Sequence, residues 1–134
     1  MTGVFADSFD FLAVINPRDP WHGLVATYAS EKNELLVTTG WVLTEVGDAC
    51  SHHPFNRALF CDLYDSLKTR DSVYVVPTTD ELLDAGVDLY VNRPDKQWSL
   101  TDCISFVVME REGITDALTG DKHFEQAGFN VLLK

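Results

Sequence analysis

The chain has 134 residues, of which 46% are hydrophobic and 23% are charged. This length corresponds to about one domain, and this composition is that of a folded protein rather than a disordered one. Ten Lys and Arg residues stand against twenty-one Asp and Glu residues, so the formal net charge is −11. Such a charge argues against a broad basic face that wraps duplex DNA or grips an anionic membrane. We therefore expect one domain spanning residues 1–134, with any polyanionic partner held locally.

The first sixteen residues lack the basic region and the cleavage site of a signal peptide. No stretch approaches the roughly 20 apolar residues that cross a bilayer, so we expect a cytoplasmic protein without a membrane contact. Cys50, Cys61 and Cys103 are an odd number without CxxC spacing, which indicates neither a disulfide framework nor a zinc site. We expect them to be buried free thiols.

The chain begins with a predicted strand that passes directly into a helix. Residues 4–6 form a short apolar run that ends at Asp7, and residues 9–15 then carry apolar side chains at helical spacing. An Asp-Pro pair at residues 19–20 is typical of an N-cap followed by proline at the first helical position. This pair predicts a second helix through about Lys32.

The middle of the chain alternates in the same way. Residues 35–38 predict a strand, after which Thr39 is placed to cap a helix, and Pro54 begins a further helix. The apolar faces of these two helices are Val42, Leu43, Val46 and Ala49, and Ala58, Leu59, Leu63 and Leu67. Residues 73–76, directly before Pro77, give the clearest strand signal in the sequence.

Two helices follow Pro77. The first begins at Thr79 with acidic residues in its first turn, which favour a helix N-terminus. Its predicted apolar face is Leu82, Leu83, Val87 and Tyr90. The second begins with a capping box at residues 99–102 and is apolar nearly all round over residues 104–109. A helix of this kind has to lie at the centre of the fold.

The last predicted elements are a strand at residues 114–118, a short helix at 121–127 closed by Gly128, and a strand at 131–133. No two strands are joined by a two-residue hairpin turn, and helices separate them throughout. The sequence therefore predicts a three-layer α/β/α domain with a mostly parallel sheet of four to five strands.

Four acidic residues follow these strands or open the helices after them. Asp7 follows the first strand, Glu45 lies about two turns into the helix after the second, and Asp121 follows the fourth. Asp102 opens the apolar helix. In an open parallel sheet, ligands gather outside the carboxyl ends of the strands, where helix N-termini also point. We therefore expect the four carboxylates to meet in one pocket.

Such a cluster requires a cation. Two like charges about 4 Å apart repel by about 4 kcal/mol at an effective dielectric constant near 20. Oxygen ligands without His or Cys partners suit Mg²⁺ or Mn²⁺ rather than zinc. The pattern therefore predicts a Mg²⁺ (or Mn²⁺) site formed by carboxylates.

The segments around these acids are VFADSFDFLAVIN from Val4, LTEV around Glu45, WSLTDCIS around Asp102, and ITDALTGDKHFEQAGF from Ile114. Together they resemble the PIN-domain family, in particular the small VapC-type ribonuclease toxins and their stand-alone relatives. The resemblance runs from Val4 to Leu133, and the Thr-x-Asp-x-x-Phe segment near the C-terminus is its most specific part. It implies a parallel-sheet domain with an acidic metal pocket, in agreement with the elements above.

The resemblance also implies the site and its chemistry. The metal-site acids of the family fall on Asp7, Glu45, Asp102 and Asp121, with Thr119 as the small polar residue that supports Asp121. Asp116 is the competitor for the fourth position, and we favour Asp121 because it lies beyond the strand end. The implied activity is that of a metal-dependent endoribonuclease acting on single-stranded or structured RNA. The family likeness further implies the toxin of a toxin–antitoxin pair, with a small antitoxin as partner, and a homodimer.

In the expected mechanism, Asp7, Asp102 and Asp121 hold one or two ions, and Glu45 orients or deprotonates the attacking water. Phosphate contacts are expected from Arg18, Lys32, Arg57, Lys68, Arg70, Arg93, Lys96 and Lys122. Candidates for stacking on unpaired bases are Trp21, Trp98 and Phe55, each of which also suits a core or interface position.

Other interpretations remain open for the same residues. Asp7, Asp102 and Asp121 are each placed to cap a helix, and Glu45 could be solvated. We expect Asp10 at the surface of the first helix. The four histidines, His22, His52, His53 and His123, are dispersed and favour surface or hydrogen-bonded positions over metal ligation.

Two other functions compete with the nuclease. One is a PIN-like protein that acts mainly by binding a protein partner, with weak or no catalysis. The other is a phosphotransfer domain, which fits less well because residues 7–10 lack the Asp-x-Asp pattern. The acidic residues between Asp80 and Asp88 are expected to form a solvated helix face.

Overall fold

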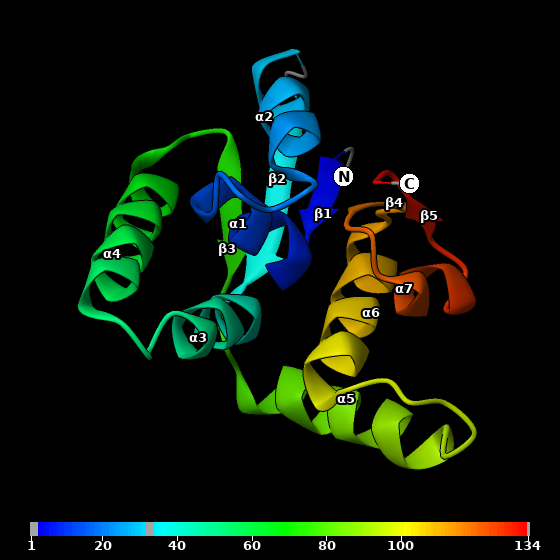
Figure 1. The fold of residues 1–134 in the computed structure, drawn as a ribbon. Coiled ribbons are helices and arrows are strands. Elements are labelled where there is room, and N and C mark those ends of the chain that lie inside the picture. The colour runs from blue at the N-terminus through cyan, green and yellow to red at the C-terminus, as the bar shows by residue number, and fades with distance from the viewer. Residues whose placement is uncertain (1–2, 32–33, 134) are drawn as a thin grey trace.

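The computed structural model describes residues 3–31 and 34–133 (Figure 1). Within these ranges five strands form one parallel sheet in the order β3-β2-β1-β4-β5. The strands are β1 (Gly3–Ala6), β2 (Leu35–Thr39), β3 (Val73–Val76), β4 (Asp116–Leu118) and β5 (Asn130–Val131). Since β1 lies at the centre with crossovers running to both sides, the carboxyl ends of all the strands face one edge.

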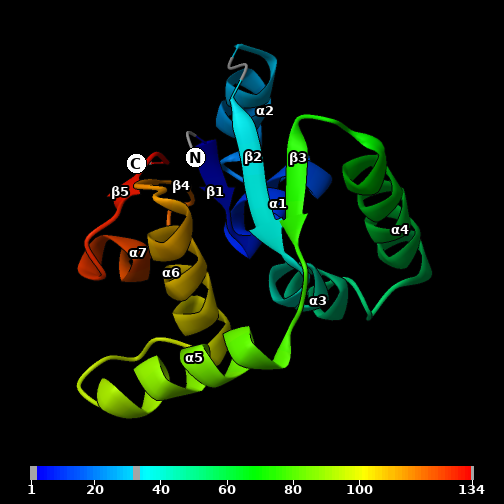
Figure 2. The same cartoon turned by 180° about the vertical axis from the view of Figure 1, so that it is seen from behind.

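Seven helices lie in the described part of the chain. They are α1 (Ser8–Ile15), α2 (His22–Glu31), α3 (Gly40–Ala49), α4 (Pro54–Thr69), α5 (Asp80–Asn92), α6 (Leu100–Glu112) and α7 (Lys122–Gln126). In Figure 1, α1 lies in front of β2 and β3, and in Figure 2 it lies behind them, so it covers one face of the sheet. The predicted three-layer α/β/α fold is confirmed.

Helix α6 is central, as its apolar sequence predicts. Its buried residues include Cys103, Ile104, Phe106, Val108 and Met109. Helix α5 crosses the lower end of α6 in Figures 1 and 2. A Cβ atom on Gly86 of α5 would lie only 2.3 Å from Cγ1 of Ile104, so the close approach of the two helices requires glycine there.

Side-chain caps fix the starts of the two helices that carry Glu45 and Asp102. The Oγ1 atom of Thr39 accepts a hydrogen bond from the N–H of Val42 at 3.2 Å and begins α3. Ser99 and Asp102 form a reciprocal capping box at the start of α6. Both caps were predicted from the sequence and are confirmed.

Several boundaries differ from the predictions. Helix α2 begins at His22 rather than at residue 20, because Asp19 first forms a turn. The Oδ1 atom of Asp19 accepts from the N–H of Trp21 at 2.8 Å, and its carbonyl accepts from the N–H of His22 at 3.0 Å. The predicted end of this helix at Lys32 lies outside the described residues. Strand β5 ends at Val131, two residues before the predicted end.

Strand β4 begins two residues later than predicted because helix α6 ends with a left-handed turn. Gly113 adopts a φ of 68°, and the N–H of Ile114 donates to the carbonyl of Met109 at 2.9 Å. Ile114 is therefore still part of the helix terminus, and pairing with β1 starts only at Asp116.

Some predicted apolar positions are exposed. On α4, Leu67 is buried and Ala58 is exposed, and on α3 Ala49 is exposed. On α5 the buried face consists of Leu82 and Gly86 instead of reaching Val87 and Tyr90, the latter being 50% exposed. These helices lie at the outside of the fold and contact it with a narrower stripe than their sequence periodicity indicates.

The cysteines are free thiols, but the prediction that all are buried is wrong for one. Cys50 and Cys103 are buried, whereas Cys61 is exposed on α4. No helix within the described ranges is long and apolar enough to span a bilayer.

Candidate active site

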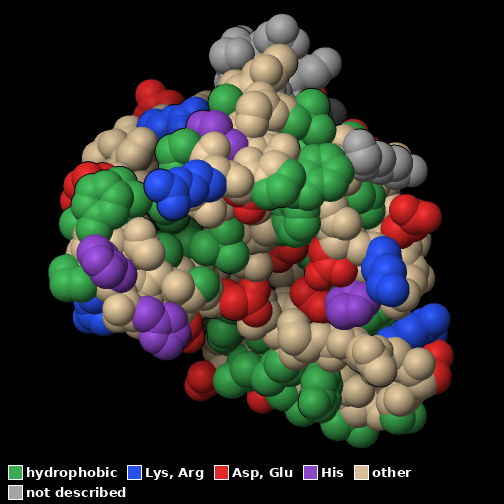
Figure 3. All heavy atoms as spheres, in the orientation of Figure 1, with side chains coloured by type: hydrophobic (Ala, Val, Ile, Leu, Met, Phe, Trp, Pro, Cys, Tyr) green, Lys and Arg blue, Asp and Glu red, His purple; other side chains and the backbone are tan. Residues whose placement is uncertain are grey.

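Acidic side chains gather in a hollow on the face shown in Figure 3, between the elements that leave the carboxyl edge of the sheet. Asp7 comes directly after β1, and Asp121 comes three residues after β4. Glu45 lies in the second turn of α3, and Asp102 lies in the first turn of α6. The negative charges of Asp102 and Glu45 both raise the pKa of Asp7, and that of Asp121 raises the pKa of Asp102. The four predicted acids therefore lie near enough for their charges to act on one another.

Asp7 is the most deeply buried of the four, and its side chain accepts hydrogen bonds from the hydroxyls of Thr119 and, at 3.5 Å, Ser8. The residue is 3% exposed, and its Oδ2 atom accepts a hydrogen bond from Oγ1 of Thr119 at 3.0 Å. Burial raises the pKa of Asp7 to about 7, because desolvation and the neighbouring negative charges outweigh its hydrogen bonds. Asp7 occupies the N-cap position of α1, but within the described residues its side chain makes no capping hydrogen bond, so helix capping alone does not account for it.

Thr119 links two of the acids. Its hydroxyl donates to Asp7 and accepts from the N–H of Asp121 at 3.0 Å. The next residue, Gly120, lies against the ring of Phe9, where a Cβ atom would be 2.6 Å from Cζ. The tight Thr-Gly-Asp turn therefore holds Asp7 and Asp121 in a fixed relation. The resemblance implied a contact of Thr119 with Asp121 alone, so its hydrogen bond to Asp7 was not predicted.

Asp102 is both a helix cap and a member of the cluster. Its N–H donates to Oγ of Ser99 at 3.0 Å, and its Oδ2 atom accepts from the N–H of Ser99 at 3.1 Å. Burial raises the pKa of Asp102 despite these bonds and despite a contact with His123. The capping interpretation is therefore confirmed for this residue, and its role in a metal site stays a prediction.

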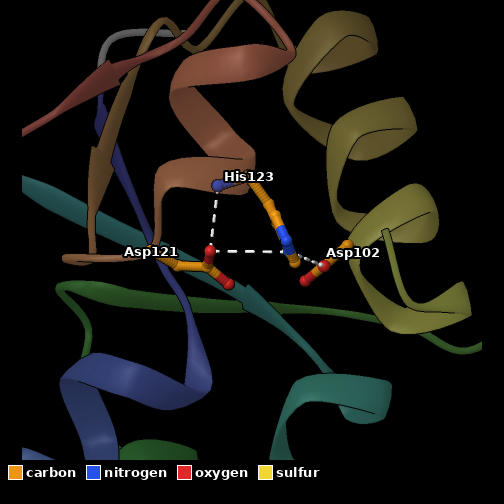
Figure 4. Close-up of side chains that lie close together, drawn as sticks. All are labelled: Asp102, Asp121 and His123. Carbon is orange, nitrogen blue, oxygen red and sulfur yellow. Dashed lines mark hydrogen bonds and ion pairs between the residues drawn. The ribbon is translucent and has the colours of Figure 1, made fainter. Parts of the chain in front are cut away.

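His123 is hydrogen-bonded, as expected, and its partner is Asp102, one of the predicted site acids. Figure 4 shows its ring pointing between two carboxylates: Nδ1 is 3.1 Å from Oδ2 of Asp102 and 3.5 Å from Oδ1 of Asp121. One ligand atom from each of the three residues lies within 4.8 Å of the others. The position of His123 could have been predicted from the sequence. Asp121 was a candidate cap of the last helix, and a cap of this kind holds the residue two positions later at the same edge of the sheet.

Comparisons with known proteins find a nuclease of similar sequence and fold. No family model matches the chain. The chain resembles the 23S rRNA-specific endonuclease VapC20 of Mycobacterium tuberculosis, in strains CDC 1551 / Oshkosh and H37Rv. The two are 28% identical over 126 residues, which cover 94% of this chain and 95% of the relative. The crystal structure of M. tuberculosis VapC20, a sarcin–ricin loop cleaving toxin, superposes with a TM-score of 0.85 at 24% identity, covering 95% of this chain and 96% of that one. The resemblance to VapC-type PIN-domain ribonucleases is confirmed.

The prediction that Asp10 lies at the surface is wrong. This residue is 4% exposed rather than at the surface, and burial together with the charge of Asp7 raises its pKa to about 7. It lies one helical turn after Asp7 on α1. The sequence places apolar residues on both sides of Asp10, and that pattern was the available signal that it faces inward.

The competitor Asp116 lies away from the PIN-like site. It begins β4, at the amino end of that strand, and its Oδ1 atom accepts from Nδ2 of Asn130 at 3.0 Å.

The acids of α5 are exposed, as expected for a solvated face. Among them, Glu81 forms a bidentate ion pair with Arg111, in which Nη2 of Arg111 lies 2.7 Å from Oε2 of Glu81.

The donor atoms of Asp102, Asp121 and His123 suit a divalent cation. Carboxylate oxygens from Asp102 and Asp121 and a nitrogen from His123 lie within reach of one ion. The pKa of Asp7 and of Asp102 is raised mainly by burial and further by the negative charges of neighbouring carboxylates. A bound cation would favour the ionised carboxylates, so a divalent metal fits these residues.

Proposed function

We propose that this chain is a metal-dependent endoribonuclease that hydrolyses phosphodiester bonds in single-stranded or structured RNA. The proposal is supported by the charges of Asp102 and Glu45 acting on Asp7, by Asp102 and Asp121 offering ligand atoms within 4.8 Å of each other, and by a fold that matches VapC20. VapC20 acts on 23S rRNA and is described as a toxin. These similarities support RNA as the substrate class and a role as the toxin of a toxin–antitoxin pair, with a small antitoxin as partner.

The chemistry assigns each acid a task. A Mg²⁺ or Mn²⁺ ion held by these acids would neutralise charge on the phosphate and supply an activated water. In this proposal Asp7, Asp102 and Asp121 hold the cation, and Glu45 orients or deprotonates the attacking water. Thr119 keeps the Asp7 carboxylate turned toward the site through its 3.0 Å hydrogen bond.

Basic side chains flank one side of the acidic hollow in Figure 3, over α7 and over the α5–α6 connection. The sequence there contains Lys122, Arg93 and Lys96. Arg93 and Lys96 line a cavity of about 600 Å³ whose wall includes Ser99, the capping partner of Asp102. In a chain with a net charge of −11, this side is where we propose that RNA phosphates bind.

The expected stacking platforms are revised by the structure. Trp98 is only 6% exposed and lies beneath the guanidinium of Arg93, 5.0 Å from the ring centroid, so it is closed to a base. Trp21 packs edge-on against Phe9 at 5.7 Å. Phe55 is 64% exposed and stays a candidate for stacking or for a protein contact.

The proposal is tested by incubating purified protein with single-stranded and structured RNA in Mg²⁺, in Mn²⁺ and in EDTA. We expect cleavage with a cation and none in the chelator. The variant Asp102→Asn is the control for a contaminating nuclease, and it should be inactive in every buffer. Cleavage that persists in EDTA would remove the metal-dependent mechanism.

The second candidate function is a binding module with little or no catalysis. It is favoured by a groove of about 520 Å³ between α1 and α4 with a mixed lining: apolar side chains such as Leu12, Ile15, Phe55 and Leu59, and polar ones such as Arg18 and Asp19. An antitoxin or a second copy of the chain, as in the expected homodimer, would both suit such a surface. Light scattering on the purified chain detects a dimer, and a protein inactive on all RNAs would favour this second function.

A further inference from the structure

We infer that His123 contributes an imidazole nitrogen to the cation site, so that the site prefers a first-row transition cation such as Mn²⁺ over Mg²⁺. From the sequence we expected an all-oxygen site for Mg²⁺ or Mn²⁺, without a histidine ligand. The inference rests on the metal site of the proposed nuclease, and it concerns the kind of ligand and the kind of cation.

The geometry places the nitrogen where a ligand would lie. Nδ1 of His123 is 3.1 Å from Oδ2 of Asp102 and 3.5 Å from Oδ1 of Asp121 (Figure 4). The side chains come from α6 and from the start of α7, so they approach from two directions. One donor atom from each lies within 4.8 Å of the others, the spacing that lets all three ligate one ion.

The backbone holds the imidazole in this position. The N–H of His123 donates to Oδ1 of Asp121 at 2.9 Å, which ties the ring's own residue to one of the carboxylates that it faces. The next residue, Phe124, is fully buried, and its ring lies 4.9 Å from that of Phe106 and 6.2 Å from that of Phe5. The short helix α7 is thereby anchored in the core, and His123 cannot leave the site by moving the backbone.

The nature of the donor decides which cation is favoured. Mg²⁺ binds oxygen and gives up its waters reluctantly, whereas imidazole suits the first-row transition ions, whose affinities rise from Mn²⁺ onward. The carboxylates of Asp7, Asp102 and Asp121 serve both kinds of ion. His123 adds a contact that only the transition cation uses well, so its removal should weaken the two kinds of ion unequally.

The experiment measures the binding of Mn²⁺ and Mg²⁺ by calorimetry and the ligands of Mn²⁺ by pulsed electron paramagnetic resonance. Wild-type protein is compared with His123→Ala and His123→Gln, and His52→Gln in the exposed α3–α4 connection is the matched control. We expect a ¹⁴N coupling on bound Mn²⁺ in the wild type and in His52→Gln, and its loss in both His123 variants. Mn²⁺ affinity should fall roughly tenfold or more in His123→Ala, the size of effect known for groups around metal sites, with a smaller loss for Mg²⁺.

The glutamine variant separates ligation from a positioning role. If His123 only held Asp102 by a hydrogen bond, Gln would restore Mn²⁺ affinity and wild-type Mn²⁺ would show no ¹⁴N coupling. Either result would overturn the inference, as would an equal loss of Mg²⁺ and Mn²⁺ affinity in His123→Ala.

The failure of the inference is distinguishable from the failure of the proposed function. Mn²⁺ that binds without a nitrogen ligand, in a protein that still cleaves RNA, would refute the role of His123 alone. A wild-type protein that binds neither cation would refute the metal site, and with it both proposals.

Discussion

The raised pKa of Asp7 predicts that this residue destabilises the metal-free fold. Its pKa is raised from 3.8 to about 7, and each pH unit between these values corresponds to 1.36 kcal/mol. The ionised carboxylate therefore costs the folded state up to about 4 kcal/mol above pH 7. Asparagine cannot ionise, and its amide oxygen can still accept the hydrogen bond from Thr119. We expect Asp7→Asn to raise the free energy of unfolding in EDTA at pH 8 by about 2–4 kcal/mol.

The pH dependence has a definite sign. Below the unfolded value near 3.8, Asp7 is protonated in both states and costs nothing. As the pH rises toward 7, the unfolded chain ionises first, and the wild type loses stability relative to the variant. The gain from Asp7→Asn should therefore be small near pH 4 and reach its full size above pH 7.

The assay is urea unfolding in EDTA at pH 4.5 and at pH 8, with Asp88→Asn on the exposed face of α5 as control. Added Mn²⁺ should stabilise the wild type and have a weaker effect on Asp7→Asn. A variant that is less stable than the wild type at pH 8, or one whose gain is the same at both pH values, would refute the account of Asp7.

Three further predictions follow from the packing and the charges. Gly86→Ala places a methyl group against Ile104, and overpacking should lower the free energy of unfolding by about 1–3 kcal/mol, measured by urea titration. Thr119→Val removes two hydrogen bonds and should reduce RNA cleavage strongly while the circular dichroism spectrum is retained; full activity would contradict the linking role of Thr119. Lys96→Glu should weaken the binding of RNA to an Asp102→Asn background by roughly threefold or more in fluorescence anisotropy, with Lys68→Glu on α4 as control. An equal loss in both variants would indicate only a general effect of charge.

Periodicity and capping chemistry were sufficient to predict most of the fold. The strand before Asp7, the Thr39 cap and the capping box of Ser99 each have a local cause that lies within a few residues. The predicted ends of helices and strands were wrong where a local hydrogen bond competed with the sequence pattern. At Asp19, for example, the side chain accepts a hydrogen bond that forms a turn before α2 begins. The predicted buried face of α5 was wrong for a different reason. Tyr90 fits the helical periodicity of the apolar residues, but its side chain faces solvent at the outside of the fold.

The site was partly predictable for the same reason. Strand ends and helix starts place Asp7, Asp102 and Asp121 at one edge, which requires only the topology of a parallel sheet. The burial of Asp10 and the position of His123 depend on side-chain packing across elements. Neither follows from spacing alone, and each changes the chemistry: one adds a buried carboxyl beside Asp7, and the other adds a nitrogen donor.

The central claim is that the clustered acids bind a divalent cation with which the chain cuts RNA. The most direct measurement follows the cleavage of ribosomal RNA by the purified wild type and by Asp102→Asn, with Mn²⁺ and after its removal by chelation. The account predicts cleavage only by the wild type with the cation present, and its return when Mn²⁺ is restored. Equal cleavage by Asp102→Asn, or undiminished cleavage by the chelated wild type, would contradict it.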